Sequence, residues 1–282
     1  MTPAALAPRE ETVTGAGADI FMRSWRPAGT PRAVVAICHG FNSHSGYYLW
    51  AGVELAAQGF AVYALDLRGR GRSSGERFYI EKFSEYQNDV DTMIHLVLSR
   101  DPGLPVFLLV HSAGGVIATN YALDHQADLA GLICESFAFR VPAPDFVLAA
   151  VKGLSHLTPH ANVLTLKNED FSRDPQVVEQ MNTDPLIANE SQPSLTVAEM
   201  VRADERLERD FPLLKIPVFI MHGTLDKATR PEGSQLFYDT VGSSDKTLKL
   251  YEGHAHDLLN DYGREQVMAD IVDWVGARLP KA

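Results

Sequence analysis

Short apolar runs alternate with amphipathic helical patterns along most of the chain. The runs that predict strands lie at residues 33–38, 60–66, 106–110, 129–134, 218–221 and 247–251. Several of these runs are apolar on both faces, as strands of a parallel sheet must be when helices cover each side. The segments that predict helices lie at residues 83–100, 112–125, 233–241 and 264–279.

Two early segments, residues 11–15 and 18–27, alternate between apolar and polar positions and predict an antiparallel pair at the edge of the sheet. Strands that alternate with helices indicate a layered α/β fold. We therefore expect a mostly parallel central sheet flanked by helices.

One interval interrupts this alternation. From about residue 140 to residue 210 no strand is predicted, and helical pieces are separated by prolines. The first of these pieces, residues 145–157, is strongly apolar. Doubly wound folds bind ligands at the carboxyl ends of their strands, so we expect a helical cap over that edge. The predicted organisation is a core of residues 1–139 and 213–282 around a cap of residues 140–212.

The composition is that of an ordinary globular protein, with 282 residues, 45% of them hydrophobic and 22% charged. A net charge of −11 argues against nucleic acid as a partner. Cys38 and Cys134 each lie within an apolar run and are expected to be buried, reduced thiols. The N-terminus lacks the basic region of a signal peptide, and no apolar stretch approaches the ~20 residues that span a bilayer. We therefore expect a cytoplasmic protein.

A serine stands between a predicted strand and a predicted helix in the segment His111-Ser112-Ala113-Gly114-Gly115. A serine at that position, followed by small residues, is typical of a nucleophile elbow, which exposes the hydroxyl at the top of the sheet. The helix N-terminus also favours the negative charge that develops during attack. Serine is a favoured N-cap residue as well, so a purely structural role for Ser112 stays open at this point.

Two loops downstream can supply partners for Ser112. Asp226 follows one predicted strand, and both His254 and His256 follow the last one. A serine hydroxyl is a weak nucleophile until a base takes its proton, and a carboxylate must orient that base. Because these loops follow strands, they are expected at the same edge of the sheet as Ser112. We predict the triad Ser112, Asp226 and His256, in the order nucleophile, acid, base.

The base and the acid each have an alternative. His256 directly precedes the expected start of the last helical region and is the preferred base, while His254 stays open. Asp257 adjoins the base and is expected to be a cap or a surface residue, which makes it a weaker acid candidate than Asp226.

The segment His39-Gly40-Phe41 ends an early strand and is the expected source of one oxyanion donor. A hole of this kind combines the N–H of the residue after the nucleophile with an N–H from such a loop, which makes Ala113 and Phe41 the candidates. His39 is expected to hydrogen-bond within its own loop.

The sequence resembles the monoacylglycerol lipase and lysophospholipase branch of the α/β-hydrolase superfamily over nearly the whole chain. The matching segments are HGFNSHSGYY, DLRGRGRSSGER, the serine turn, NTDPL, HGTLDKAT and DKTLKLYEGHAH. The resemblance implies a cap that admits a single acyl chain, ester hydrolysis through an acyl-enzyme, and no cofactor. It also supports His256, since the family's base falls on the last residue of YEGHAH.

One residue departs from the family pattern. The family usually has glycine two residues before the nucleophile, and this chain has Val110. A β-branched side chain there should crowd the elbow unless its neighbours yield. Ala113, where the family commonly carries a bulkier methionine, can provide room, so we expect compensated packing and retained function.

Three further patterns have weaker functional interpretations. DLRGRGRSSGER lacks the spacing of a dinucleotide-binding loop and is expected to be a structural loop with solvated arginines, although Arg68, Arg70, Arg72 and Arg77 could meet an anionic headgroup. Five loop histidines lack any metal-binding spacing, so no metal is predicted; they are His39, His44, His111, His254 and His256. The apolar side chains that could line an acyl tunnel, or merely pack the cap, are Phe146, Val147, Leu148, Val151, Leu154 and Leu157.

The expected function is hydrolysis of small-molecule monoacyl esters such as monoacylglycerols or lysolipids. Short-chain or polyester-oligomer esters, thioesters and lactones stay open as alternatives, and a non-catalytic ligand-binding role is the third hypothesis. An apolar cap can contact a lipid surface transiently or pair with a second cap. The sequence leaves that choice, the acyl length, the headgroup and the oligomeric state open.

Overall fold

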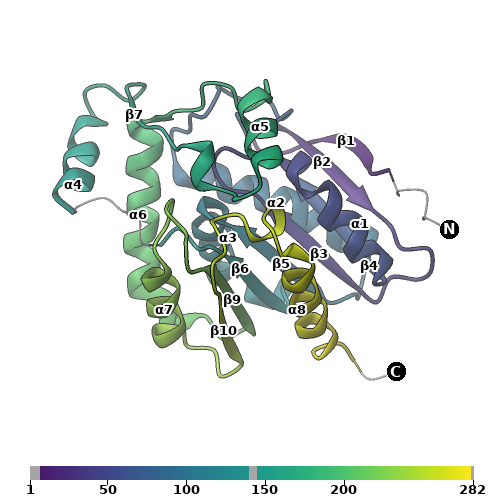
Figure 1. Cartoon of the computed structure of the whole chain (residues 1–282). Coiled ribbons are helices and arrows are strands. Elements are labelled where there is room, and N and C mark those ends of the chain that lie inside the picture. The colour runs from purple at the N-terminus through teal and green to yellow at the C-terminus, as the bar shows by residue number, and fades with distance from the viewer. Residues whose placement is uncertain (1–6, 140–144, 281–282) are drawn as a thin grey trace.

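A computed structural model describes residues 7–139 and 145–280 of the chain (Figure 1). The strands are β1 Arg9–Thr14, β2 Asp19–Trp25, β3 Ala33–Cys38, β4 Phe60–Leu65, β5 Val106–His111, β6 Gly131–Glu135, β7 Asn162–Leu164, β8 Gln192–Pro193, β9 Val218–Gly223 and β10 Lys246–Tyr251. The α-helices are α1 Leu49–Ala57, α2 Phe83–Arg100, α3 Ala113–Asp124, α4 Asp145–Leu154, α5 Pro175–Thr183, α6 Ser194–Asp210, α7 Pro231–Thr240 and α8 Arg264–Gly276.

The central sheet has eight strands in the order β1-β2-β4-β3-β5-β6-β9-β10. The six strands from β4 to β10 in this order pair in parallel. The edge strand β1 pairs antiparallel with β2, and β2 pairs antiparallel with β4. The predicted α/β fold with its mostly parallel sheet and antiparallel edge is confirmed.

Helices cover both faces of this sheet (Figure 1). On one face α2, α3 and α7 bury apolar side chains that include Tyr86, Ile117 and Phe237. On the other face α1 and α8 bury a second cluster that includes Leu55 and Ile271. Each inner strand is therefore enclosed on both sides, which explains its continuous apolar sequence.

Between β6 and β9 the chain forms an insertion in the α/β pattern. Residues 140–212 are called the insert from here on, and its described part contains α4, β7, α5, β8 and α6. Helix α6 packs against both α3 and α4. The prediction that this interval has no strand is wrong, because β7 and β8 form a short antiparallel pair. Strands of three and two residues are too short to show a period in the sequence. The expected start of the cap, with Pro142 and Pro144, lies outside the described residues.

Both cysteines are free and buried, as predicted. Burial raises the pKa of Cys134 to about 12 and raises the pKa of Cys38 further, so both thiols stay protonated at neutral pH. Within residues 7–139 and 145–280, none of the helices combines the length and the apolar character needed to cross a bilayer.

Candidate active site

Ser112 occupies a strained turn between β5 and α3. Its backbone angles are φ 54° and ψ −122°, in a region that residues with a side chain seldom adopt. Its side chain makes no capping hydrogen bond to the helix. Ser112 therefore stands at the N-cap position of α3 without capping the helix through its hydroxyl, and it lies on the wall of a cavity.

Two glycines allow the chain to pass close to this turn. A Cβ on Gly114 would lie 2.4 Å from the carbonyl oxygen of His39, and a Cβ on Gly40 would lie 2.8 Å from the Cβ of Ser112. Neither position has room for a side chain. The loop after β3 is therefore held directly against the turn that carries Ser112.

Val110 lies in β5 between two small side chains. It is paired with Cys38 of β3 on one side and with Cys134 of β6 on the other. All three residues are fully buried in the same apolar cluster, which also contains Ala113. The small side chains of its two strand neighbours leave room for the β-branched side chain below the elbow.

The Asp226 carboxylate follows β9 and receives several hydrogen bonds. Its Oδ1 accepts from the N–H groups of Ala228 and Thr229 at 2.8 and 2.9 Å, and its Oδ2 accepts from the Thr229 hydroxyl at 2.7 Å. Two imidazoles also meet Oδ2, His256 through Nδ1 at 2.7 Å and His222 through Nε2 at 2.9 Å. Burial alone would raise the pKa of Asp226, but the two histidines hold it well below its usual range.

His256 is oriented by this carboxylate. Its Nδ1 meets Asp226, while its buried Nε2 has no hydrogen-bond partner among the described residues. The imidazole packs against two rings, with its centroid 4.7 Å from the tilted His111 ring and 4.9 Å from the Phe171 ring, which it meets edge to face. His254 instead lies near its own backbone, with Nδ1 3.2 Å from the Glu252 carbonyl oxygen. The structure thus brings Asp226 to His256.

His222 and Thr229 were not singled out by the sequence. His222 lies at the end of β9 with Nδ1 2.7 Å from the Ser234 hydroxyl, so both ring nitrogens have partners. Thr229 donates its hydroxyl hydrogen to Asp226 and also lines the same cavity as Ser112. The sequence feature that could have identified His222 as a partner of Asp226 is its position four residues earlier, at the end of a predicted strand.

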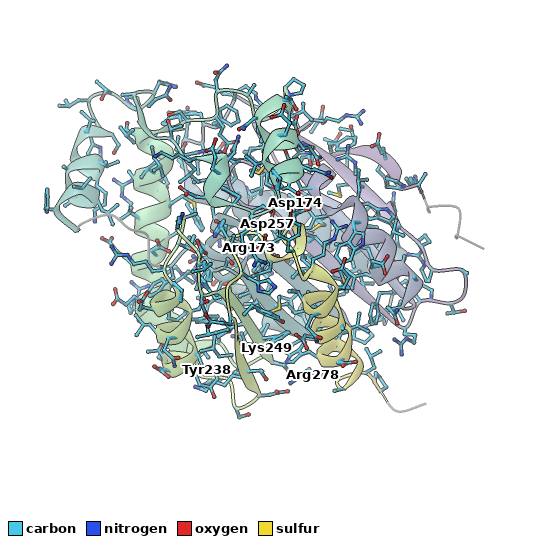
Figure 2. All side chains as sticks on the ribbon, in the orientation of Figure 1. Arg173, Asp174, Tyr238, Lys249, Asp257 and Arg278 are labelled. Carbon is cyan, nitrogen blue, oxygen red and sulfur yellow. The ribbon has the colours of Figure 1, made fainter. Side chains whose placement is uncertain are left out.

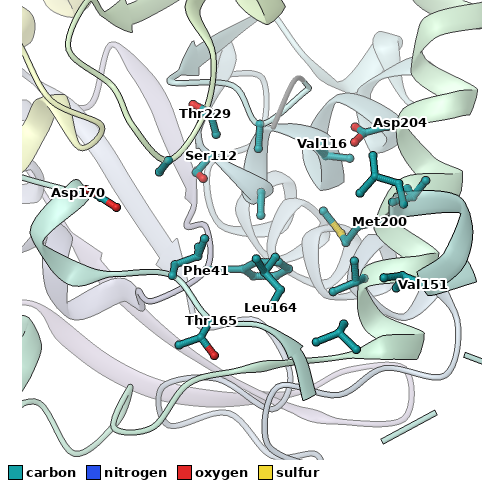
Figure 3. A pocket seen from close by; sticks show the side chains of 18 of the residues that line it. Phe41, Ser112, Val116, Val151, Leu164, Thr165, Asp170, Met200, Asp204 and Thr229 are labelled. Atoms are coloured by element: carbon teal, nitrogen blue, oxygen red, sulfur yellow. The ribbon is translucent and has the colours of Figure 1, made fainter. Parts of the chain in front are cut away.

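The two predicted oxyanion donors lie beside Ser112. Phe41 and Ala113 line the cavity together with the serine. Figure 3 labels Phe41 and Ser112 on its wall. Ala113 is the first residue of α3, so its N–H is one of the four that a helix leaves without an intrahelical acceptor. His39 is structural: its Nε2 accepts from the Leu67 N–H at 3.0 Å and its Nδ1 meets the Gly40 carbonyl oxygen at 2.7 Å. Burial lowers the pKa of His39 to about 4, which keeps the ring neutral.

The cavity next to Ser112 has a volume of about 350 Å³ and is lined mainly by apolar side chains from α3, α4, β7 and α6. On α4 the predicted lining residues divide into two faces. Val147 and Val151 line the cavity, as does Leu148. Phe146 is 76% exposed and Leu154 is 40% exposed, and neither lines it.

A buried group of ionisable side chains lies behind His256. His111, Glu135 and Asp257 place potential metal-ligand atoms within 4.8 Å of one another, the one such group among residues 7–139 and 145–280. Burial, with repulsion from Asp257, raises the pKa of Glu135 well above its usual value. Because a metal ligand must be deprotonated, a proton on Glu135 competes directly with any ion there.

Asp257 was expected to be a cap or a surface residue, and it stands at the N-cap position of the short 3₁₀ helix Leu258–Asn260 but is not on the surface. It is 6% exposed, and both of its carboxylate oxygens accept from the Asn260 side-chain amide. Figure 2 labels Asp257 near Arg173 at the end of the sheet that the insert covers, and Arg278 toward the other end. Burial raises the pKa of Asp257 to about 6. The sequence gives no sign of this burial, because Asp257 is followed closely by the polar residues Asn260 and Asp261.

The arginine-rich loop after β4 also differs from its expectation. Arg70 is fully buried and Arg68 is 6% exposed, so these two are not solvated. Arg68 instead binds Asp89, with Nη2 2.7 Å from Oδ1. Sequence patterns predict solvated arginines because buried charges need partners that are remote in the chain.

Three comparisons identify proteins that this chain resembles. The model of the family described as serine aminopeptidase, S33 matches residues 29–263. A monoacylglycerol lipase from Mycolicibacterium smegmatis is 32% identical over 267 residues, which cover 93% of this chain and 95% of that protein. A human monoglyceride lipase is 33% identical over 275 residues, which cover 96% of this chain and 91% of that protein.

The likeness extends to solved structures. The crystal structure of a monoacylglycerol lipase from Paleococcus ferrophilus superposes on this chain with a TM-score of 0.82 at 29% identity. The match covers 92% of this chain and 99% of that one. Sequence and structure therefore agree over almost the full length.

Proposed function

The chain belongs to the serine aminopeptidase S33 family and has the α/β-hydrolase fold, and from that premise we propose that it cleaves carboxylic esters of single acyl chains. The substrates would be of the monoacylglycerol or lysophospholipid type. The observation that carries this proposal is the position of Ser112, in a strained turn on the wall of a mainly apolar cavity.

Ser112, His256 and Asp226 would perform the acylation half of the reaction. The Ser112 Oγ attacks the ester carbonyl carbon while His256 Nε2 takes its proton. The new tetrahedral oxyanion accepts hydrogen bonds from the N–H groups of Phe41 and Ala113. When the ester C–O bond breaks, His256 returns the proton to the leaving alcohol and an acyl-enzyme remains. Asp226 stays ionised throughout, in keeping with its lowered pKa.

Water would complete the cycle. His256 takes a proton from the water that attacks the acyl carbonyl carbon, and the same oxyanion donors serve again. Collapse of the second tetrahedral intermediate breaks the bond to the Ser112 Oγ, which recovers its proton from His256. The products are a free fatty acid and the restored serine, and no step needs a cofactor.

The insert would act as the cap over this site. Its helices α4 and α6 supply much of the cavity wall, including Val151 and Met200 (Figure 3). On this proposal, core segments 1–139 and 213–282 carry the chemistry, and residues 140–212 select the acyl chain. Exposed Phe146 and Leu157 on the outer side would contact lipid transiently. The cytoplasmic location expected from the sequence stays a prediction.

A series of p-nitrophenyl esters of increasing chain length tests the substrate class. Each methylene buried in a tight apolar cavity contributes about 0.8 kcal/mol, so kcat/KM should rise about fourfold per methylene until the cavity is full. Val151→Trp should shorten the preferred acyl chain, because Val151 lines the cavity. Phe146→Trp, on the exposed side of the same helix, is the matched control and should leave the preference unchanged.

A flat chain-length series in an active enzyme would overturn the single-acyl-chain proposal. It would favour the alternative substrates, which are short-chain or polyester-oligomer esters, thioesters and lactones. Binding of acyl ligands without turnover would instead favour the non-catalytic role. Fluorescent fatty-acid displacement measures that binding independently of hydrolysis.

A further inference from the structure

The loop after β3 that carries Phe41 is bonded to the insert, and the contact next to Phe41 is made by a buried carboxylate, Glu190. Glu190 lies between α5 and β8 and its side chain is 1% exposed. Its Oε1 accepts from the Asn42 N–H at 2.9 Å and also from Arg70 Nη1. Asn42 has a φ of 50°, in the left-handed region, so this contact holds an unfavourable backbone conformation in place.

Arg70 extends the same contact to the Phe41 side chain. Its guanidinium carbon lies 4.2 Å from the centroid of the Phe41 ring, and the arginine is fully buried. The guanidinium also donates from Nη2 to Gln192 Oε1 at 2.7 Å and from Nε to the Tyr86 hydroxyl at 3.3 Å. Glu190 thus fixes the backbone next to Phe41, and its partner Arg70 fixes the Phe41 ring.

A second carboxylate of the insert holds the far side of this loop. Asp184 Oδ2 meets His44 Nε2 at 2.8 Å and accepts from the Tyr47 hydroxyl at 3.1 Å. His44 Nδ1 accepts from the Gly46 N–H at 3.0 Å, so Nε2 carries the hydrogen that is donated to Asp184. Residues 41–47 are therefore held by the insert at both ends.

A buried ion pair is a costly way to obtain stability alone. Removing two charges from water costs about as much as their attraction returns, and apolar replacements are often equally stable. What an ion pair does supply is fixed geometry between particular atoms. Here that geometry is applied one peptide unit from the Phe41 N–H.

We propose that Glu190 is a positioning residue for the oxyanion site: paired with Arg70, it holds the Phe41 peptide so that its N–H meets the developing oxyanion. This inference rests on the proposed function. It makes the charge-stabilising half of the site dependent on the placement of the insert, so that a displaced insert would weaken transition-state stabilisation as well as acyl-chain binding.

The test compares Glu190→Ala and Glu190→Gln with the wild type on a soluble short-chain ester, with rates per active site titrated. Losing an oxyanion donor outright costs about 100- to 1000-fold in kcat, and misplacing one should cost about 10- to 100-fold in Glu190→Ala, with KM little changed. Glu190→Gln keeps the side-chain volume and an oxygen that can accept from Asn42, so it should fold and retain an intermediate kcat.

A transition-state mimic separates positioning from a purely structural role. An acyl trifluoromethyl ketone forms a hemiketal with the serine, and its oxygen occupies the oxyanion site. Its affinity should fall in Glu190→Ala by the same factor as kcat, while binding of the fatty-acid product stays unchanged. Asp124→Asn is the matched control, since it breaks the Asp124–Arg206 ion pair, which also joins the insert to the core but lies away from Phe41. It should change neither quantity.

Two results would overturn the inference, and they are distinguishable. If Glu190→Ala and Glu190→Gln lower only the melting temperature, with wild-type kcat and ketone affinity, the ion pair is structural. If the wild-type enzyme neither hydrolyses any ester nor binds the ketone, the proposed function fails first, and this inference fails with it.

Discussion

The two halves of the proposed active site are held by different parts of the chain. The acid–base half is built within the core, where Asp226 receives hydrogen bonds from residues after or at the end of β9 and from His256 after β10. In the oxyanion half, Ala113 lies on the core helix α3, whereas Phe41 lies on the loop after β3, which Glu190 and Asp184 of the insert hold in place.

This difference separates proton transfer from charge stabilisation. The hydrogen bonds to Asp226 come from core residues, although the Phe171 ring of the insert packs against the His256 imidazole at 4.9 Å. The hydrogen bond from Asp226 should therefore keep His256 oriented even when the insert is displaced. The position of the Phe41 peptide, in contrast, depends on the insert, because Glu190 binds the adjacent Asn42 N–H. We expect substitutions in the acid–base half to abolish catalysis, and substitutions at the contact with the insert to reduce it.

His256→Ala should have the largest effect, because it removes the base that activates Ser112. In serine hydrolases such a loss lowers kcat by about 10⁶-fold. Turnover of a p-nitrophenyl ester measures it, and circular dichroism should show an unchanged fold. His254→Ala is the matched control, since the structure places His254 away from Asp226. A comparable loss in the control would reassign the base.

Asp226→Asn should have the next largest effect. The asparagine keeps the shape but favours the wrong tautomer of His256, which lowers kcat by about 10⁴-fold in the analogous case. Asp257→Asn, the other carboxyl beside His256, should retain most activity. If the two variants lost activity equally, the division of roles between these carboxyls would be wrong.

Val110→Gly tests the packing below the elbow, between the two halves. Removing a buried side chain flanked by Cys38 and Cys134 should lower the free energy of unfolding by about 2–4 kcal/mol. Urea denaturation measures this loss, while kcat at low temperature should change only a few-fold. A gain in activity of several orders of magnitude would show that Val110 obstructs the elbow.

Asp257→Asn should have the smallest effect, and the size of that effect depends on pH. The folded-state pKa of Asp257 is about 6, above the value of about 3.9 for an unfolded chain. The folded state therefore binds more protons between pH 4 and 6, and stability falls as pH rises through that window. At pH 7 the variant should be more stable than the wild type by about 1–3 kcal/mol.

Below pH 4 this advantage should disappear, since both states of the wild type are then protonated. Chemical denaturation at pH 4 and pH 7 gives the comparison. The exposed Asp239→Asn is the control and should change stability by less than about 0.5 kcal/mol at either pH. An Asp257→Asn variant that is less stable at pH 7 would contradict the raised pKa.

Much of the fold could be predicted because its inner strands are enclosed on both faces and its helices repeat at a regular spacing. Helix α1 was missed, and Gly52 within it shows why. A Cβ at Gly52 would lie 2.5 Å from the Trp25 ring, so packing demands a residue with poor helix propensity. The pair β7–β8 was missed because it is too short to show a pattern.

The site was predictable where chemistry follows strand ends, and less so where it depends on burial. Asp226 and His256 follow strands that the sequence marks clearly. Glu190 and Arg70 are 120 residues apart and become partners only through the placement of the insert. A single sequence records neither that pairing nor the burial that forces it.

Labelling with a fluorophosphonate tests the central claim most directly, since the reagent modifies only an activated serine. Intact-mass and peptide analysis of the wild type should show one adduct, located on Ser112. Ser112→Ala should show none, and His256→Ala should react far more slowly. A folded wild-type protein that forms no adduct, or forms it on another residue, would contradict the claim that Ser112 is the nucleophile.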